Sequence, residues 1–294
     1  MNGEAIALDS GWIAANPLPV HGAGTTKNSR GRVVVVGGSR LVPGAPRLTA
    51  EAALRVGAGK VRMATVAAAA LGLGLMVPEA ASVALPEDGD GEIGAGAAEC
   101  LERSLKACDA LVVGPGIGTA DAAARLLRAV LEQRCEDTVL VIDAMAIGCA
   151  RDLKGALARF RDRLIFTPHH GEMALLTGRD EADIAAHGAG IARDAAAEHG
   201  AVIVLKGTDT HIAAPDGALL HHGGGGSGLA TGGSGDVLAG AIAGLLSRGA
   251  APPVAAGWGV WLHGQAGRRV ATTRGPIGFL ARELAAEFPR LLPQ

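Results

Sequence analysis

The sequence predicts an α/β fold in which a mostly parallel sheet lies between two layers of helices. Three observations support this: apolar runs of strand length recur along the first two thirds of the chain, each run is continuous rather than alternating, and helical stretches separate the runs. Continuous apolar runs are typical of strands covered on both faces, as in parallel sheets. The predicted parallel strands are Arg32 to Val36, Val61 to Val66, Ala110 to Val113, Val139 to Ile142, Leu164 to Phe166 and Val202 to Leu205.

After these strands the pattern changes to an antiparallel hairpin. Thr210 to Ala213 and Ala218 to His221 flank the turn sequence Pro215-Asp216-Gly217, so the sheet should be mixed at one side. A helix should begin at Pro46, because proline suits the first helical position, and end near Gly57 to Gly59. Further helices are predicted from Ala120 to Gln133, Gly235 to Arg248, Val254 to Ala271 and Phe279 to Leu292.

Length and composition predict one globular domain over residues 1–294, with residues 1–26 as an N-terminal extension. The chain has 294 residues, of which 49% are hydrophobic and 19% charged, and no Pro-rich or Ser-rich linker divides it. Aromatic residues make up only 2% and Tyr is absent. The core should therefore consist of Ala, Val and Leu, and a bound purine ring should rest on aliphatic side chains.

The charge distribution favours a small-molecule substrate. A net charge of −2 without a basic stripe argues against nucleic acid as a partner. The longest weakly apolar run, Met63 to Val77, is shorter than the roughly 20 residues that span a bilayer, and no signal region begins the chain, so we expect a cytoplasmic protein without membrane contact. The cysteines show neither CxxC nor zinc-finger spacing and should be free, buried thiols; they are Cys100, Cys108, Cys135 and Cys149.

The segment from Leu229 to Gly240 brings glycine backbone and one carboxylate to the start of a predicted helix. The N–H groups of Gly233 to Gly235 and the positive end of the helix would form a pocket for a phosphate-like anion. Asp236 lies in the first turn, where the helix field should keep it ionised and able to accept a proton from a hydroxyl group. This combination predicts phosphoryl transfer. The structural alternative is that Ser234 caps the helix and Asp236 complements its dipole.

Other polar residues follow the ends of predicted strands, where ligands bind in open parallel sheets. Asp143 ends a buried strand, so its carboxylate needs solvent, a partner or a cation. His169 and Glu172 have i, i+3 spacing at a helix start and could either face one site or form a cap. Lys206 to Thr210 could place a cation, amides and two hydroxyls near a nucleotide, although a surface hairpin explains them nearly as well. No GxxxxGK[ST] motif occurs, which excludes a P-loop.

The order of these segments resembles the ATP/ADP-dependent NAD(P)H-hydrate dehydratases of the ribokinase-like superfamily. The resemblance extends from about Lys27 to Leu292 and implies a ribokinase-like three-layer α/β/α sandwich, here a standalone dehydratase without the N-terminal epimerase domain that members often carry. The matching segments are Lys27 with Gly31, Gly37-Gly38-Ser39, Gly44-Ala45-Pro46, Gly57-Ala58-Gly59, Pro78-Glu79, Gly114-Pro115-Gly116-Ile117-Gly118, Val141 to Ala144, Thr167-Pro168-His169 with Glu172, Leu205-Lys206-Gly207 with Thr210, and Leu229 to Gly240.

The resemblance implies a repair enzyme that dehydrates (6S)-NAD(P)H hydrate back to NAD(P)H at the expense of ADP or ATP, by phosphorylating the C6 hydroxyl and releasing phosphate. It also implies a homo-oligomer, often a tetramer, and a Mg²⁺ ion. Carried over by position, the resemblance makes Asp236 the base, and the amides of Gly233, Ser234 and Gly235 the groups that stabilise charge. The nucleotide would be held by Lys206, Gly207, Thr208, Asp209 and Thr210. The hydrated nicotinamide would be bordered by Ala45, Gly116 and His169, and Glu172 would help to place Mg²⁺ through water.

Two segments depart from the family pattern. Asp143-Ala144-Met145-Ala146-Ile147 stands where the family usually has Asp-Ala-Asp-Ala-Leu, which predicts a less polar site. Gly224 to Gly228 replaces an Asn-Pro-Gly segment, and a flexible glycine run predicts weaker nucleotide binding. Two alternatives therefore stay open: a small-molecule kinase of the same superfamily, acting on a hydroxymethyl-pyrimidine, thiazole alcohol or sugar, and a catalytically silent nucleotide-binding homologue.

Overall fold

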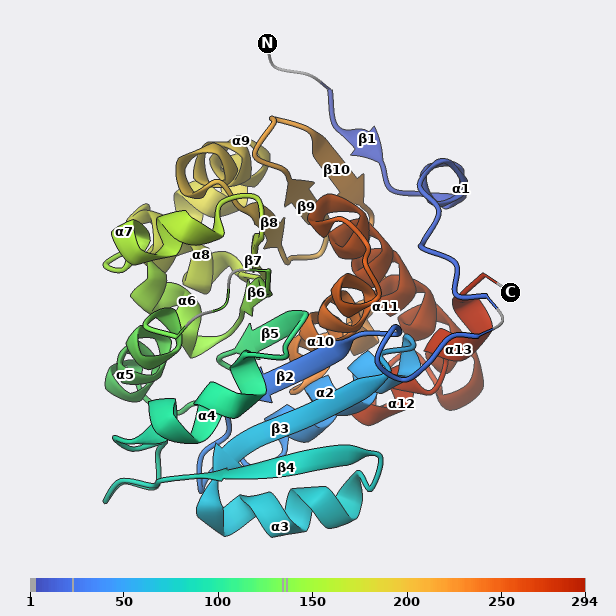
Figure 1. Ribbon diagram of the computed structural model, residues 1–294. Coiled ribbons are helices and arrows are strands. Elements are labelled where there is room, and N and C mark those ends of the chain that lie inside the picture. The colour runs from blue at the N-terminus through green and yellow to red at the C-terminus, as the bar shows by residue number, and fades with distance from the viewer. Residues whose placement is uncertain (1–3, 23, 134, 136, 294) are drawn as a thin grey trace.

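A ten-stranded sheet forms the middle layer of the computed structural model (Figure 1), which describes residues 4–22, 24–133, 135 and 137–293. The strand order is β1-β10-β9-β8-β7-β6-β5-β2-β3-β4, and only β9 runs antiparallel to its neighbours. The predicted mostly parallel sheet with a late antiparallel hairpin is confirmed. The strands are β1 Ile6–Ala7, β2 Arg32–Val36, β3 Lys60–Val66, β4 Ala80–Leu85, β5 Ala110–Val113, β6 Val139–Ile142, β7 Leu164–Phe166, β8 Val202–Leu205, β9 Thr210–Ala213 and β10 Leu219–His222.

Helices cover both faces of this sheet. Alternate residues of β2 belong to different cores: Val33 and Val35 pack with α2, α10 and α11, whereas Val34 and Val36 pack with α4, α5 and α6. Burial on both faces is the reason why the strand sequences are continuously apolar. The helices are α1 Ser10–Ala15, α2 Ala45–Arg55, α3 Ala67–Met76, α4 Ala97–Leu105, α5 Ala120–Leu131, α6 Met145–Ala150, α7 Lys154–Leu157, α8 His170–Thr177, α9 Glu181–His199, α10 Ser234–Ser247, α11 Pro252–Arg274, α12 Ala281–Ala285 and α13 Phe288–Leu291.

The close packing of α10 on α2 fixes the helix that carries the predicted anion loop. Gly240 faces the backbone of Thr49, and a Cβ atom at position 240 would collide with the Thr49 carbonyl oxygen. Gly244 likewise faces Val56 and the backbone of Ala53. Two glycines one turn apart therefore let the two helix backbones approach closely, and α10 is held in one position.

The structure differs from the sequence-based prediction at the edges of the fold. The predicted helix from Phe279 to Leu292 is wrong: two short helices, α12 and α13, replace it, and Pro289 in the first turn of α13 cannot donate a hydrogen bond to a preceding turn. Residues 4–22 contribute β1 and α1, and the Trp258 indole donates to the Asn16 carbonyl oxygen at 2.7 Å. Residues Met1 to Gly3, Ala23, Arg134, Glu136 and Gln294 of the expected domain lie outside the described residues.

The four cysteines are free thiols, as predicted, but burial holds for only two of them. Cys108 and Cys135 are buried, whereas Cys149 is half-buried and Cys100 is exposed. In the part of the chain that the structure describes, no helix combines the length and apolar character needed to cross a membrane.

Candidate active site

A cavity of about 890 Å³ opens at the carboxyl ends of the strands, where the sequence predicted a ligand site. The loops after β6, β7, β8 and β10 line it together with the first turn of α10 and one face of α11. Most of the predicted site residues meet here. Those that line the cavity are His169, Glu172, Lys206, Gly207, Thr208, Thr210, Gly233, Ser234, Gly235 and Asp236.

The start of α10 has the form of an anion loop. Gly233, with φ of +88°, is the residue before the helix and provides no side-chain cap. Among the described residues, the N–H groups of Gly233 and Gly235 have no hydrogen-bond acceptor, whereas the Ser234 N–H donates to the Thr231 carbonyl oxygen at 3.2 Å. The structural alternative for Ser234 is wrong, because its hydroxyl does not cap the helix and lies 2.9 Å from His263 Nε2. Two of the three predicted amides are therefore available to an anion.

Asp236 is half-buried in this first turn, and its pKa is shifted in the direction opposite to the prediction. Burial, together with repulsion from Asp143 and Glu172, raises the pKa of Asp236 to about 7, although Lys206 opposes the shift. This upward shift opposes the expected full ionisation of the carboxylate at neutral pH. The helix field favours the anion, but desolvation and two nearby carboxylates outweigh it.

Lys206 supplies the partner that the buried Asp143 requires. Lys206 Nζ lies 3.2 Å from Asp143 Oδ1 and 3.8 Å from Glu172 Oε2, and the Thr167 hydroxyl donates to Asp143 Oδ1 at 2.6 Å. Burial lowers the pKa of Lys206, but attraction to Asp143 and Glu172 is stronger in sum and raises that pKa above its ordinary value. A Cβ atom built on Gly235 would lie 3.3 Å from Nζ, so the ammonium group stands beside the anion loop.

His169 and Glu172 form the cap that the sequence left as an alternative. The His169 Nδ1 accepts from the Glu172 N–H at 3.3 Å, and Glu172 Oε2 accepts from the His169 N–H at 2.8 Å. Both residues nevertheless line the cavity. Burial raises the pKa of Glu172, against the attraction of Lys206. Within the described ranges no group of three or more His, Cys, Asp or Glu residues is placed to hold a metal ion by itself.

Three predicted site residues lie outside the cavity lining. Ala45 and Gly116 lie beside each other, since a Cβ atom on Gly116 would be 2.9 Å from Ala45 Cβ, but neither lines this cavity. Asp209 faces a neighbouring cavity of about 550 Å³, and its Oδ2 lies 3.5 Å from His221 Nε2. Met145, whose place in the sequence led us to expect a less polar site, does not line the cavity either.

Two histidines in the lining were missed by the sequence reasoning. His263 of α11 places Nε2 2.9 Å from the Ser234 hydroxyl and 3.1 Å from the Ser234 carbonyl oxygen, and burial lowers the pKa of His263 to about 4. Burial also lowers the pKa of His222 to about 4, so both imidazoles are neutral at pH 7. Single histidines inside a strand and a helix carry no motif, and only the fold brings them to the site.

The glycine run after β10 is tethered to α11. Arg268 donates from Nη1 to the Gly224 carbonyl oxygen, and Gly225 packs on Gly264. Gly224 and Gly226 have φ of +70° and +100°, which side chains rarely adopt. The run therefore has a defined path along the cavity wall.

Comparisons with known proteins identify the family of the chain. Residues 33–290 match the family model described as NAD(P)H-hydrate dehydratase. The ADP-dependent (S)-NAD(P)H-hydrate dehydratase of Xanthomonas campestris pv. campestris is 45% identical over 280 residues, which cover 95% of this chain and 93% of that protein.

Solved structures show the same relationship. The ADP/ATP-dependent NAD(P)H-hydrate dehydratase from Bacillus subtilis, co-crystallised with ATP/Mg²⁺, is 28% identical with a TM-score of 0.79 and covers 98% of this chain and 97% of its own. A ribokinase-like superfamily protein from Enterococcus faecalis, also 28% identical with a TM-score of 0.79, covers 93% of this chain and 90% of its own. The predicted ribokinase-like architecture is confirmed, and the chain belongs to the NAD(P)H-hydrate dehydratase family.

Proposed function

We propose that this chain dehydrates (6S)-NAD(P)H hydrate to NAD(P)H at the expense of ADP or ATP. The observation that carries the proposal is the position of Asp236, in the first turn of α10, at a cavity shared with Lys206 and the free amides of Gly233 and Gly235. The printed activities of the Xanthomonas and Bacillus relatives support the choice of substrate.

The chemistry requires activation of a poor leaving group. Hydroxide leaves C6 with difficulty, whereas a phosphate ester can be expelled by the lone pair of the ring nitrogen. Asp236 would take the proton of the C6 hydroxyl as the hydroxyl oxygen attacks the terminal phosphoryl group, and the bond from that phosphorus to the departing AMP or ADP would break. Loss of phosphate and of a proton from C5 then restores the ring double bond. A base with a pKa of about 7 is suited to this proton transfer at neutral pH.

Negative charge on the transferred group would be stabilised by the anion loop and by Lys206. The amides of Gly233 and Gly235 are donors held in place before the reaction, which is the efficient arrangement for electrostatic stabilisation. His263 is a positioning residue: it contacts the hydroxyl and the carbonyl oxygen of Ser234, the residue that lies between Gly233 and Gly235, and so holds the anion loop in place.

The nucleotide would extend from the anion loop along the glycine run. Lys206 to Thr210 would hold its phosphates and ribose, with Asp209 at the rim, and the purine would rest on Leu229, Leu238 and Val260, which line the cavity. This aliphatic surface suits a chain with only 2% aromatic residues. Ala45, Gly116 and His169 would border the hydrated nicotinamide.

The donor set fits a Mg²⁺ ion carried by the nucleotide. Three carboxylates, Asp143, Glu172 and Asp236, face one ammonium group around the cavity, which leaves an excess of negative charge when all are ionised. Mg²⁺ typically keeps several waters and binds one or two carboxylates together with substrate phosphates. Glu172 would hold the ion through water, and the ion would neutralise charge on the phosphates.

One assay tests the function. The protein is incubated with hydrated NADH or NADPH, Mg²⁺ and either ADP or ATP, while the absorbance of the reduced nicotinamide is followed. Recovery of absorbance with either nucleotide supports the dehydratase. Nucleotide consumption with a stable phosphate ester would identify a kinase, and nucleotide binding without either reaction would identify a silent homologue.

The family resemblance also supports a cytoplasmic homo-oligomer, with a tetramer as the proposed state. Light scattering coupled to size-exclusion chromatography measures the mass directly. A tetramer should give four times the 29.3 kDa chain mass, and a monomer would contradict the proposed assembly.

A further inference from the structure

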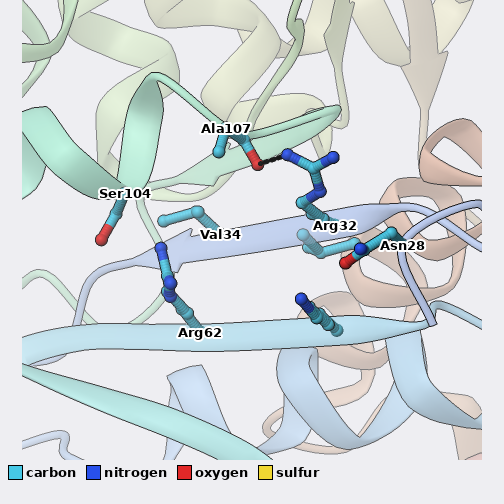
Figure 2. Close-up of a pocket in the computed structure, with 8 residues that line it drawn as sticks. Asn28, Arg32, Val34, Arg62, Ser104 and Ala107 are labelled. Atoms are coloured by element: carbon cyan, nitrogen blue, oxygen red, sulfur yellow. Dashed lines mark hydrogen bonds between the residues drawn. The ribbon is translucent and has the colours of Figure 1, made fainter.

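A third, smaller pocket lies at the amino ends of β2 and β3 (Figure 2). Its volume is about 250 Å³. The candidate active site opens at the opposite, carboxyl side of the sheet. Arg32 and Lys60 are the first residues of the two strands and are register partners, as are Val34 and Arg62. Since residues two apart in a strand share a face, Arg32, Lys60 and Arg62 all stand on one face of the sheet. The polar side chains of Asn28 and Ser104 complete the wall.

The three cationic side chains of this pocket are half-buried and lack anionic partners. In the described part of the chain, none of the three forms an ion pair with a carboxylate. Arg32 Nη1 donates to the Ala107 carbonyl oxygen at 3.3 Å, but the buried Arg32 Nε has no hydrogen-bond partner. Asp109 accepts from the backbone N–H of Arg32 at 2.7 Å and does not line the pocket.

Such an arrangement is unfavourable without a ligand. Three cationic side chains that line one small pocket make it electropositive, and a buried donor without an acceptor loses its hydration without compensation. A bound oxyanion would offset this positive potential, and its oxygens could accept from the side-chain donors that line the pocket.

We propose that this pocket binds a phosphate group, either as inorganic phosphate or as part of a small phosphomonoester. A phosphate dianion provides charge and acceptor oxygens for Arg32, Lys60 and Arg62, and leaves further acceptor capacity for Asn28 and Ser104. The volume is below the roughly 300 to 1,000 Å³ of sites for larger organic ligands, so a whole nucleotide does not fit. The pocket is therefore a site separate from the nucleotide cavity and independent of the proposed function.

The test is titration calorimetry with inorganic phosphate on the full chain at low ionic strength and pH 8. Three proteins are compared: wild type, Lys60→Gln/Arg62→Gln, and the control Lys154→Gln/Arg179→Gln. The control removes the same charge from residues that already pair with Glu198, Asp183 and Asp194. We expect the first double variant to weaken the phosphate site at least tenfold and the control to leave it unchanged. Equal binding by wild type and Lys60→Gln/Arg62→Gln would overturn the proposal.

Further ligands define the chemistry of the site. Sulfate should compete with phosphate, whereas the planar carboxylates of malonate should bind at least tenfold more weakly; malonate binding as tight as that of phosphate would overturn the phosphate assignment. Glycerol 3-phosphate distinguishes a phosphomonoester from inorganic phosphate as the ligand of the pocket. Binding as tight as that of phosphate supports a phosphomonoester, weaker binding supports inorganic phosphate, and a lack of binding by both contradicts the site.

Asn28→Asp provides an independent variant with almost unchanged shape. It places a carboxylate beside the cations, where it should raise the melting temperature without phosphate and weaken phosphate binding at least tenfold. Wild-type phosphate affinity in Asn28→Asp would contradict the proposal. Because Asn28 is an exposed residue before β2, folding should tolerate this change.

Discussion

The raised pKa of Asp236 predicts that this side chain destabilises the protein increasingly as the pH rises. Its pKa is about 7 in the folded protein and has the ordinary value of 3.8 in an unfolded chain. At a pH between these two pKa values, the folded state still binds a proton that the unfolded state has already released. Stability from this group is fully present below pH 3.8 and is lost as the pH rises through 7. Asp236→Asn keeps the shape of the side chain but removes the titration.

The magnitude follows from the two pKa values. At 1.36 kcal/mol for each pKa unit, the ionisable carboxyl lowers the free energy of unfolding relative to a neutral group by at most about 4 kcal/mol at pH 8. At pH 5 the same reasoning gives about 2 kcal/mol, because only the pH interval above 3.8 contributes. Between pH 5 and pH 8, the free energy of unfolding of Asp236→Asn should therefore rise relative to that of wild type by about 2 to 3 kcal/mol.

Urea unfolding of the two proteins at pH 5, 6.5 and 8, without nucleotide or Mg²⁺, measures this difference. Asp216→Asn, in the exposed hairpin turn, is the matched control and should show no comparable change with pH. The reasoning about the Asp236 environment would be refuted if the difference in free energy of unfolding between the two proteins stayed constant from pH 5 to 8, or changed with pH in the opposite direction.

Three further predictions concern the network, the pH dependence and the scaffold. Lys206→Met should lower the free energy of unfolding by about 3 to 5 kcal/mol in urea titrations, since Asp143 would stay buried without its cation; a loss below about 1 kcal/mol would contradict the pairing. The kcat/KM for hydrate repair should rise with pH through an apparent pKa near 7, because the basic form of Asp236 is required, and a flat profile from pH 5.5 to 8 would argue against this base. Gly240→Ala should lower the melting temperature strongly, because its Cβ would collide with Thr49. In the control Gly72→Ala, in α3, the new Cβ meets open space, so the free energy of unfolding should stay unchanged or rise by about 0.5 to 1 kcal/mol. Similar effects of both changes would contradict the α10–α2 contact.

Most of the sheet could be predicted because its strands are buried on both faces and therefore continuously apolar. The run from Arg32 to Val36 has the same bounds in sequence and structure. Edge strand β4 was missed, since half of Ala80–Leu85 is alanine and only its two end residues are buried, which weakens the apolar signal. The C-terminal helix was overextended because its apolar period continues across the position where Pro289 interrupts it.

The local part of the site was also predictable, whereas its electrostatics were not. Gly233 to Asp236 form a contiguous motif, so the loop and the carboxylate could be located from sequence. The protonation of Asp236 depends on Asp143, Glu172 and Lys206, which arrive from three other loops. No sequence spacing encodes the sum of those charges, and the local helix field alone gave the wrong direction. The contact of His263 with Ser234 is similarly a product of the fold.

The most direct test of the central claim is the activity of Asp236→Asn with hydrated NADPH, Mg²⁺ and nucleotide, measured beside nucleotide binding. If Asp236 is the base, turnover should fall by a factor of about 10² to 10⁴ while the nucleotide Kd stays within a few-fold of wild type. Substantial turnover in this variant, with a nucleotide site that still binds, would show that another group takes the proton.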